Sequence, residues 1–236
     1  WRETYSHLFL ADYDGQAVSN TRDLMQDEPW AFPLKPFWGI EQLTWSPDGL
    51  FVVYSCKKKE GKAYAISTNS DIYIYDIVAN STKNFTRNMM GYDLSPVYSP
   101  DGKMLAWESM ERDGYEADKN RLMVYNFETN QKTDYTQYFD QDVKSLRWSD
   151  DSKSLFFIAD WYGTEEVFRL DLSGKITQLS NGIHDYVEIQ FAGDRIIGAQ
   201  QSMSMPTEIF SVPVAGGDEA QLTFVNKDLL DQLSFG

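Results

Sequence analysis

Acidic side chains make up most of the residues in this chain that could do chemistry. The 236 residues include 36 Asp and Glu, two histidines and one cysteine. Two carboxylates facing each other across a cleft could hydrolyse a glycosidic bond, but with so many acidic residues we expect adjacent pairs by chance, as solvated loop charges. The neighbouring carboxylates are Glu165-Glu166, Glu116 with Asp118, and Asp150-Asp151.

The two histidines, His7 and His184, offer little chemistry by themselves. Acyl transfer by Ser, His and Asp needs a nucleophile on a sharp elbow, usually Gly-x-Ser-x-Gly, and no such pentapeptide occurs here. Two histidines without cysteine or clustered carboxylates are too few for a zinc site, and the single cysteine, Cys56, can form no intramolecular disulfide. Phosphate-binding and dinucleotide-binding glycine motifs are also absent from the sequence. We therefore expect no catalytic residue, no cofactor and no metal in this chain.

The charge of the chain bears on its partners. The formal net charge is −15, and the acidic residues are scattered and do not form a tail. Nucleic acids and anionic membranes both attract basic patches, so we expect neither as a partner. The sequence has no apolar run of about 18 residues, which argues against membrane insertion.

A repeated hairpin positions these residues. Leu43–Gly49 predicts a strand that ends in a Ser-Pro-Asp-Gly turn, and an apolar strand follows it. In such a turn Pro presets φ, Asp bonds the backbone ahead of it, and Gly supplies a positive φ, so we expect Asp48, Asp101 and Asp151 to be turn residues. Further copies of the hairpin begin at residues 96, 146 and 189.

The spacing of the copies predicts the architecture. They recur roughly every 40 to 50 residues, and each is followed by a third apolar strand and a polar fourth strand, which is the period of β-propeller blades. We therefore predict an all-β fold, a β-propeller with four full four-stranded blades and a partial one. A single propeller would fill 1–236, with a partial blade at 1–25, a loop at 26–39, blades at about 40–88, 89–140, 141–182 and 183–226, and a tail at 227–236.

The connections between second and third strands are the richest in polar and aromatic residues. They run over 57–64, 110–119, 160–166 and 201–206. In a four-stranded meander these connections emerge on one face, opposite the Ser-Pro-Asp-Gly turns. Because loops on a rigid scaffold carry function, we expect this face to be the functional one.

Blade two and the tail resemble a known family. The segments Tyr98–Trp107, Met110–Asp118 and Arg121–Asn126 look like the non-catalytic propeller of the prolyl oligopeptidase family of serine peptidases. They are most similar to its acylaminoacyl peptidase and dipeptidyl peptidase V branch. Leu222–Leu230 resembles the end of that propeller, just before the connection to an α/β-hydrolase domain.

The resemblance implies that the propeller and the hydrolase domain have separate roles. The family's nucleophile, acid and histidine lie in the hydrolase domain, and none of those motifs is present here, so proteolysis would belong to a parent enzyme and not to this chain. The family's propeller has about seven blades, so roughly two would be missing. It caps the active-site cavity, admits peptides and keeps out folded proteins. A periplasmic or secreted location is expected, although a cytoplasmic one is compatible with the sequence.

The resemblance also suggests where substrate contacts would lie. Glu116 with Asp118 could hold the free α-amino group of a peptide by charge-assisted hydrogen bonds. A purely structural loop fixed by an Arg112–Asp118 pair is the competing interpretation. The candidate substrate-facing residues are Arg112, Tyr115, Glu116, Asp118, Trp161, Phe37 and Trp38.

Two other functions stay open at the level of sequence. One is a free-standing propeller of Tol type that binds a protein partner through its loop face, and the other is a glycosidase. A partial propeller would also have unpaired edges, and exposed sheet edges recruit other chains. We therefore expect possible self-association through open propeller edges.

Overall fold

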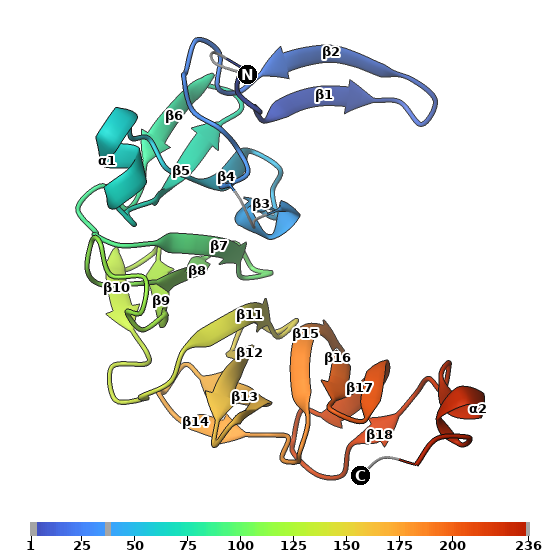
Figure 1. Ribbon diagram of the computed structural model, residues 1–236. Helices are drawn as coiled ribbons and strands as arrows, with labels where there is room; N and C mark the ends of the chain where they lie inside the picture. Colours follow the sequence, from blue (N-terminus) through green and yellow to red (C-terminus); the bar gives the residue numbers. More distant parts are fainter. Residues whose placement is uncertain (1–3, 36–38, 235–236) are drawn as a thin grey trace. The chain divides into compact units, whose positions relative to one another are not determined.

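The computed structural model describes residues 4–35 and 39–234, and its regular elements are almost all β-strands (Figure 1). The chain falls into two compact units. The first comprises Trp1–Tyr98 with Trp107–Asp118, and the second comprises Ser99–Ala106 with Lys119–Gly236. The all-β class predicted from the repeat is confirmed.

The N-terminal strands form the partial blade. Strands β1 (Phe9–Tyr13) and β2 (Val18–Asp23) pair antiparallel in a two-stranded sheet. The turn between them is closed by Asp14, whose Oδ1 accepts hydrogen bonds from the backbone N–H of Gln16 and Ala17 at 2.9 and 2.8 Å. Both strands lie within residues 1–25, where the sequence predicts a partial blade.

The next sheet has the strand order β3-β4-β5-β6. It is preceded by one turn of 3₁₀ helix at Ile40–Gln42. A short helix, α1 (Gly61–Ile66), lies between β4 and β5 where only a loop was predicted. Its two alanines are good helix formers, but fewer than two turns leave no periodicity to detect. The strands are β3 (Leu43–Trp45), β4 (Phe51–Cys56), β5 (Asp71–Asp76) and β6 (Ser81–Asn84).

A further sheet has the order β10-β9-β8-β7. The division between the two units falls within this stretch of chain, since β7 belongs to the first unit and both β9 and β10 to the second. Its strands are β7 (Asp93–Tyr98), β8 (Met104–Ser109), β9 (Arg121–Asn126) and β10 (Gln131–Asp134).

Blades three and four share one extended sheet in the second unit. A single parallel bridge, Glu165 to Asp185, connects β13 with β15. Each blade is otherwise an antiparallel meander. The strands are β11 (Val143–Trp148), β12 (Ser154–Trp161), β13 (Thr164–Asp171), β14 (Ile176–Gln178), β15 (Asp185–Ala192), β16 (Arg195–Ser202), β17 (Met205–Pro213) and β18 (Ala220–Gln221).

The connections from second to third strand in these two blades are shorter than the sequence suggested. Only Tyr162 and Gly163 separate β12 from β13, with φ of +52° and +90°. Two central residues with positive φ match the twist of a tight hairpin. The expectation of a connection over the whole of 160–166 is therefore wrong, and so is the one over 201–206, where the strands end at Ser202 and restart at Met205.

The Ser-Pro-Asp-Gly turns have the expected chemistry. Ser46 Oγ donates to Asp48 Oδ1 at 2.6 Å, and the same carboxylate oxygen accepts the backbone N–H of Leu50 at 3.0 Å. The hydrogen bond from Ser46 is the main cause that lowers the pKa of Asp48. Gly49 has a φ of +72°. The same contacts recur at Ser99 with Asp101 and at Ser149 with Asp151.

A second hydrogen bond recurs in each blade, at the other end of the third strand. A hydroxyl after the fourth strand accepts the backbone N–H of a residue near the start of the third, as when Leu122 donates to Thr136 Oγ1 at 2.8 Å. A buried N–H that would have no strand partner is thereby satisfied. The equivalent hydroxyls are Thr86 with Ile72, Ser180 with Val167, and Thr223 with Ile209.

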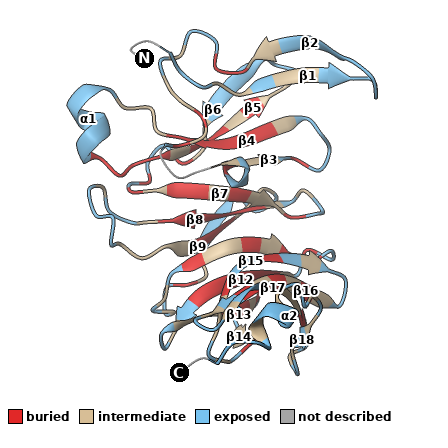
Figure 2. Ribbon diagram, turned by 45° about the vertical axis from the view of Figure 1, so that its right-hand side comes forward, coloured by how far each residue is buried: buried red, intermediate tan, exposed pale blue. Residues whose placement is uncertain are grey.

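Much of the apolar core lies on β4, β8 and β12, and Figure 2 shows β7 as largely buried too. In the first unit Tyr54 is buried between Tyr73, with ring centroids 5.6 Å apart, and Phe32 at 5.9 Å. Phe32 belongs to the loop at 26–39, so the described part of that loop packs on the core. Cys56 is a buried free cysteine in the same cluster.

The tail contains a short helix, α2 (Lys227–Leu230). Among the described residues, no helix combines the length and hydropathy needed to cross a membrane.

Candidate functional site

The blade-two loop at 110–119 is held together by one carboxylate. Asp118 Oδ1 accepts hydrogen bonds from the Arg112 guanidinium at 2.7 and 3.2 Å, and Oδ2 accepts the backbone N–H of Arg112 at 2.8 Å and of Glu111 at 3.1 Å. The hydrogen bond from the Arg112 side chain is the main cause that lowers the pKa of Asp118 to about 2. Both oxygens of Asp118 are therefore occupied by their own loop.

The same loop presents two exposed side chains. The Arg112 guanidinium lies 4.5 Å from the centroid of the Tyr115 ring, a cation–π contact that orients the tyrosine, which is 55% exposed. Glu116 is exposed and forms no hydrogen bond with any described residue. The structure thus brings Arg112, Tyr115 and Asp118 together, while the carboxylate of Glu116 is left accessible to a ligand.

Asp113 ties the blade-two loop to the blade-one loop within the first unit. Its Oδ1 accepts hydrogen bonds from Ser67 Oγ at 2.6 Å and from the backbone N–H of Thr68 at 2.8 Å. Gly114 returns a backbone N–H to Thr68 Oγ1 at 2.9 Å. A hollow of about 350 Å³ lies between the loops, lined by Lys59, Ala63, Ile66, Ser67, Asp113 and Gly114.

Of the remaining aromatic candidates, Trp161 lies among the described residues. Trp161, in the second unit, stacks on Phe139 with centroids 6.2 Å apart and contacts Phe168 edge-on at 5.5 Å. These contacts make it part of an aromatic cluster with Phe139 and Phe168. A substrate contact by Trp161 stays a prediction. Phe37 and Trp38 lie outside the described residues.

Sequence reasoning missed a cluster in the second unit. Glu166, His184 and Glu219 each place a ligand-capable atom within 4.8 Å of the other two. The premise that the histidines lack clustered carboxylates is therefore wrong for His184. The three residues are far apart in the sequence and form no motif, so only the pairing of β13 with β15 and the position of the β17–β18 loop reveal them.

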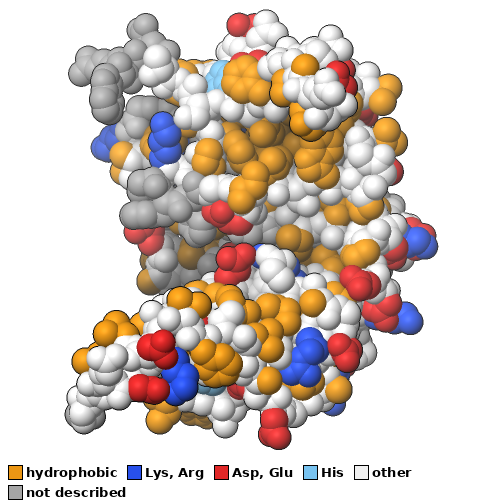
Figure 3. Space-filling view, turned by 90° about the vertical axis from the view of Figure 1, so that its right-hand side faces the viewer, with side chains coloured by type: hydrophobic (Ala, Val, Ile, Leu, Met, Phe, Trp, Pro, Cys, Tyr) orange, Lys and Arg blue, Asp and Glu red, His pale blue; other side chains and the backbone are white. Residues whose placement is uncertain are grey.

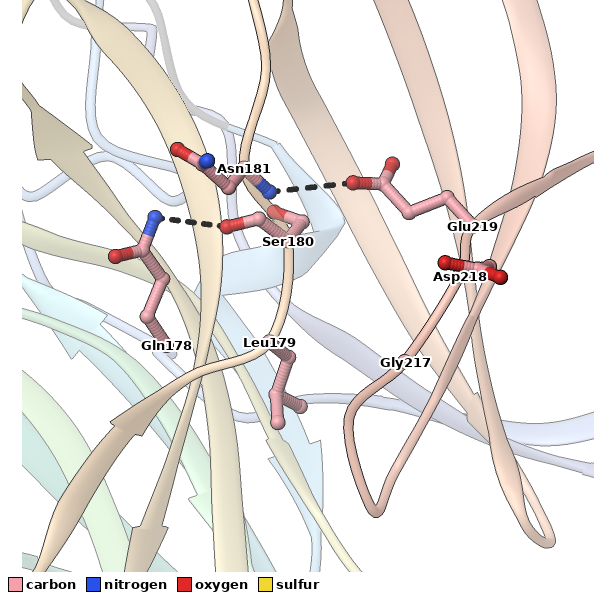
Figure 4. Close-up of a pocket in the computed structure, with 7 residues that line it drawn as sticks. All are labelled: Gln178, Leu179, Ser180, Asn181, Gly217, Asp218 and Glu219. Carbon is pink, nitrogen blue, oxygen red and sulfur yellow. Dashed lines mark hydrogen bonds between the residues drawn. The ribbon is translucent and has the colours of Figure 1, made fainter.

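The cluster adjoins a polar hollow of about 610 Å³ (Figure 4). Figure 4 shows the backbone N–H of Asn181 donating to Glu219, at 3.2 Å, and Gln178 donating to the carbonyl of Ser180, at 2.8 Å. The lining residues are Gln178, Leu179, Ser180, Asn181, Gly217, Asp218 and Glu219.

One buried acid is structural. Asp93, at the start of β7, is fully buried, and its Oδ1 accepts the indole N–H of Trp107 at 3.0 Å. Burial raises the pKa of Asp93 to about 7, opposed by hydrogen bonds from Ser109, Thr86 and Trp107. Because it has no access to solvent, this carboxyl cannot contact a substrate.

The described residues form no acyl-transfer set. His7 pairs with Asp23 at 2.6 Å and with the carbonyl of Glu28 at 3.0 Å, and neither histidine ring hydrogen-bonds a described Ser or Cys side chain. On the face drawn in Figure 3 the acidic side chains are scattered and leave no broad basic patch, in agreement with the net charge of −15.

No family model matches the chain, but a curated protein resembles nearly all of it. The chain is 40% identical over 235 residues to dipeptidyl-peptidase 5 of Porphyromonas gingivalis, an alignment that covers 99% of this chain and 34% of the relative. The chain thus spans about a third of the length of the curated relatives that it matches.

Solved structures share the fold. An acylaminoacyl peptidase in complex with Z-Gly-Gly-Phe-chloromethyl ketone superposes with a TM-score of 0.70 at 16% identity, over 96% of this chain and 32% of that one. The β-propeller domain of the trilobed protease from Pyrococcus furiosus does so with a TM-score of 0.65 at 17% identity, over 92% and 58%. The four-stranded sheets are therefore propeller blades. The chain belongs, as a β-propeller segment, to the dipeptidyl-peptidase 5 branch of the prolyl oligopeptidase family.

Proposed function

We propose that this chain is the non-catalytic, substrate-gating propeller of a periplasmic or secreted serine exopeptidase. The observation that carries the proposal is the 40% identity to a dipeptidyl-peptidase 5 over 99% of the chain. In this proposal an α/β-hydrolase domain outside the sequence supplies the nucleophile, acid and histidine. The propeller admits peptides to that domain and excludes folded proteins.

The loop at 110–119 supports a role in binding peptides. Asp118 fixes the loop from within, so the backbone that carries Tyr115 and Glu116 is organised before any ligand arrives. Preorganisation lowers the entropic cost of binding. Glu116 provides a carboxylate for the α-ammonium group of a peptide, and Tyr115 provides an apolar surface for its first side chain. Of the acidic pair suggested by the sequence, Glu116 is therefore the residue proposed to bind the α-ammonium group. Asp118 holds the loop that carries Glu116 in place.

The coding sequence beyond Gly236 in the source genome directly tests whether a separate hydrolase domain supplies the catalytic residues. A Gly-x-Ser-x-Gly elbow followed by an Asp and then a His, the order in α/β-hydrolases, is expected there. A natural stop codon directly after Gly236 would contradict the gating function. It would favour a propeller that binds a protein partner through its loop face.

Glu116→Gln tests the proposed amine contact in the protein that joins this segment to its hydrolase domain. Loss of one charge-assisted hydrogen bond should raise the KM for a dipeptide substrate with a free α-amino group about 10-fold, with little change in kcat. An N-acetylated peptide should show no change. Steady-state kinetics on both substrates provide the measurement.

Glu60→Gln, which removes an exposed carboxylate from the blade-one loop, is the matched control and should behave as wild type. Equal losses on the free and the acetylated peptide would show that Glu116 does not recognise the amine. The gating function itself would survive that result.

A further inference from the structure

We propose that Glu166, His184 and Glu219 form a binding site for a divalent transition metal ion, with Zn²⁺ as the best match. The site would connect blade three to blade four within the second unit. Glu166 lies near the start of β13, His184 directly precedes β15, and Glu219 directly precedes β18. This site is independent of the proposed peptide contacts at the blade-two loop.

The distances already approach those of a metal centre. His184 Nε2 lies 3.3 Å from Glu166 Oε2 and 3.8 Å from Glu219 Oε2. Zinc binds histidine nitrogen and carboxylate oxygen at about 2.0 to 2.2 Å, so two ligands of a tetrahedral ion lie about 3.3 to 3.5 Å apart. One edge of the site has this length, and a movement of about half an ångström at Glu219 would complete the second.

The negative charges at the site favour binding of a cation. Glu166 is fully buried, and within the described part of the chain neither it nor Glu219 has a Lys or Arg within ion-pair distance. Nε2 of His184 is shielded from solvent, is directed at the two carboxylates and makes no hydrogen bond. A divalent ion would neutralise both carboxylates and give this nitrogen a partner. Buried charges in proteins are generally paired or coordinate metals.

The carboxylates are held by a shell of hydrogen bonds. Ser180 Oγ donates to Glu166 Oε2 at 2.5 Å. Tyr186 OH and Gln200 Nε2 donate to Glu219 Oε2 at 2.5 and 2.9 Å. Such outer partners orient metal ligands and are an expected part of a built site.

The site also has room for the imidazole ring and access from solvent. A Cβ at Gly182 would lie 2.4 Å from the His184 ring, so the absence of a side chain there makes room for the ring. Glu219 lines the hollow shown in Figure 4, which gives an ion a path from solvent to the site.

The ligand set favours zinc over the alkaline-earth ions. Mg²⁺ and Ca²⁺ prefer all-oxygen sites, whereas imidazole suits Zn²⁺ and its transition-metal neighbours. Three protein ligands leave a fourth position for water. Because its ligands come from two blades, bound zinc would stabilise the folded state in proportion to the free metal concentration.

Isothermal titration of the chelator-treated chain with ZnCl₂ tests the proposal. One ion per chain is expected to bind, and the melting temperature should rise on zinc addition. His184→Gln and Glu219→Gln should each weaken binding at least about 10-fold, which is the lower bound for disturbing even the outer shell of a metal site. Circular dichroism of each variant confirms that it is folded.

Glu208→Gln is the matched control. Glu208 accepts a hydrogen bond from Thr223 as Glu166 does from Ser180, but its other partner is Asn226, with no histidine at the site. This variant should bind zinc as wild type does. Failure of the wild-type chain to bind, or binding that persists unchanged in His184→Gln, would overturn the proposal and leave His184 as an ion-pair partner of the two carboxylates.

Discussion

At the scale of single residues, Asp93 shows what burial does to a carboxyl group. Its pKa of about 7 in the folded protein exceeds the ordinary value of 3.8, so between these values the folded state binds more protons than the unfolded state. The contribution of Asp93 to the free energy of unfolding is therefore largest below pH 4. It should fall by about 1.4 kcal/mol per pH unit as the pH rises towards 7.

Asp93→Asn should remove this slope, because the amide keeps an acceptor for the Trp107 indole and carries no proton to lose. We expect the variant to gain stability relative to wild type as the pH rises from 5 to 7. Urea unfolding at several pH values measures the difference. A constant difference across this range would show that Asp93 is ionised in the folded state.

Residue chemistry was predictable where it is local. The turn function of Asp48 follows from its neighbours, because Ser46 and Leu50 are two residues away on either side. The pairing of Arg112 with Asp118 was also foreseen as one of two interpretations. The contacts of His184 were not, since its partners are separated from it by 18 and 35 residues and no spacing rule connects them.

At the scale of elements, the hydroxyl that accepts a third-strand N–H in each blade should contribute measurably to the free energy of unfolding. Thr136 is buried and accepts the N–H of Leu122. Thr136→Val keeps the shape of the side chain but leaves that N–H without a partner, so we expect a loss of about 1 to 3 kcal/mol in the free energy of unfolding. Chemical denaturation gives the value.

Thr129→Val, in an exposed turn of the same blade, is the control and should change stability by less than about 0.5 kcal/mol. Similar losses in both variants would mean that valine itself, and not the missing acceptor, is responsible.

Elements were predictable where their pattern repeats. Four copies of a strand and turn motif defined the blades, but the tight hairpin at Tyr162-Gly163 and helix α1 were missed. The two-residue turn needs positive φ at both central residues, which Tyr162 does not indicate, and a helix of fewer than two turns is too short to show a 3.6-residue period. Both depend on local backbone geometry that residue types specify weakly.

At the scale of the whole molecule, repetition made the fold class predictable. The assignment to a peptidase family came from the blade-two motifs and the tail, which the relatives confirm. The different roles of Asp118 and Glu116 in the loop did not follow from the sequence, because both are acidic and only the fold shows that Arg112 engages Asp118.

The bridge between Glu165 and Asp185 makes blades three and four parts of one hydrogen-bonded network. Their backbone amides should therefore behave as a single foldon in native-state hydrogen exchange, with one shared opening free energy for β12, β13 and β16. The strands β1 and β2, which form a sheet of only two, should exchange faster. Mass spectrometry of exchanged peptides would resolve the two rates, and unequal protection of β13 and β16 would show that each blade opens by itself.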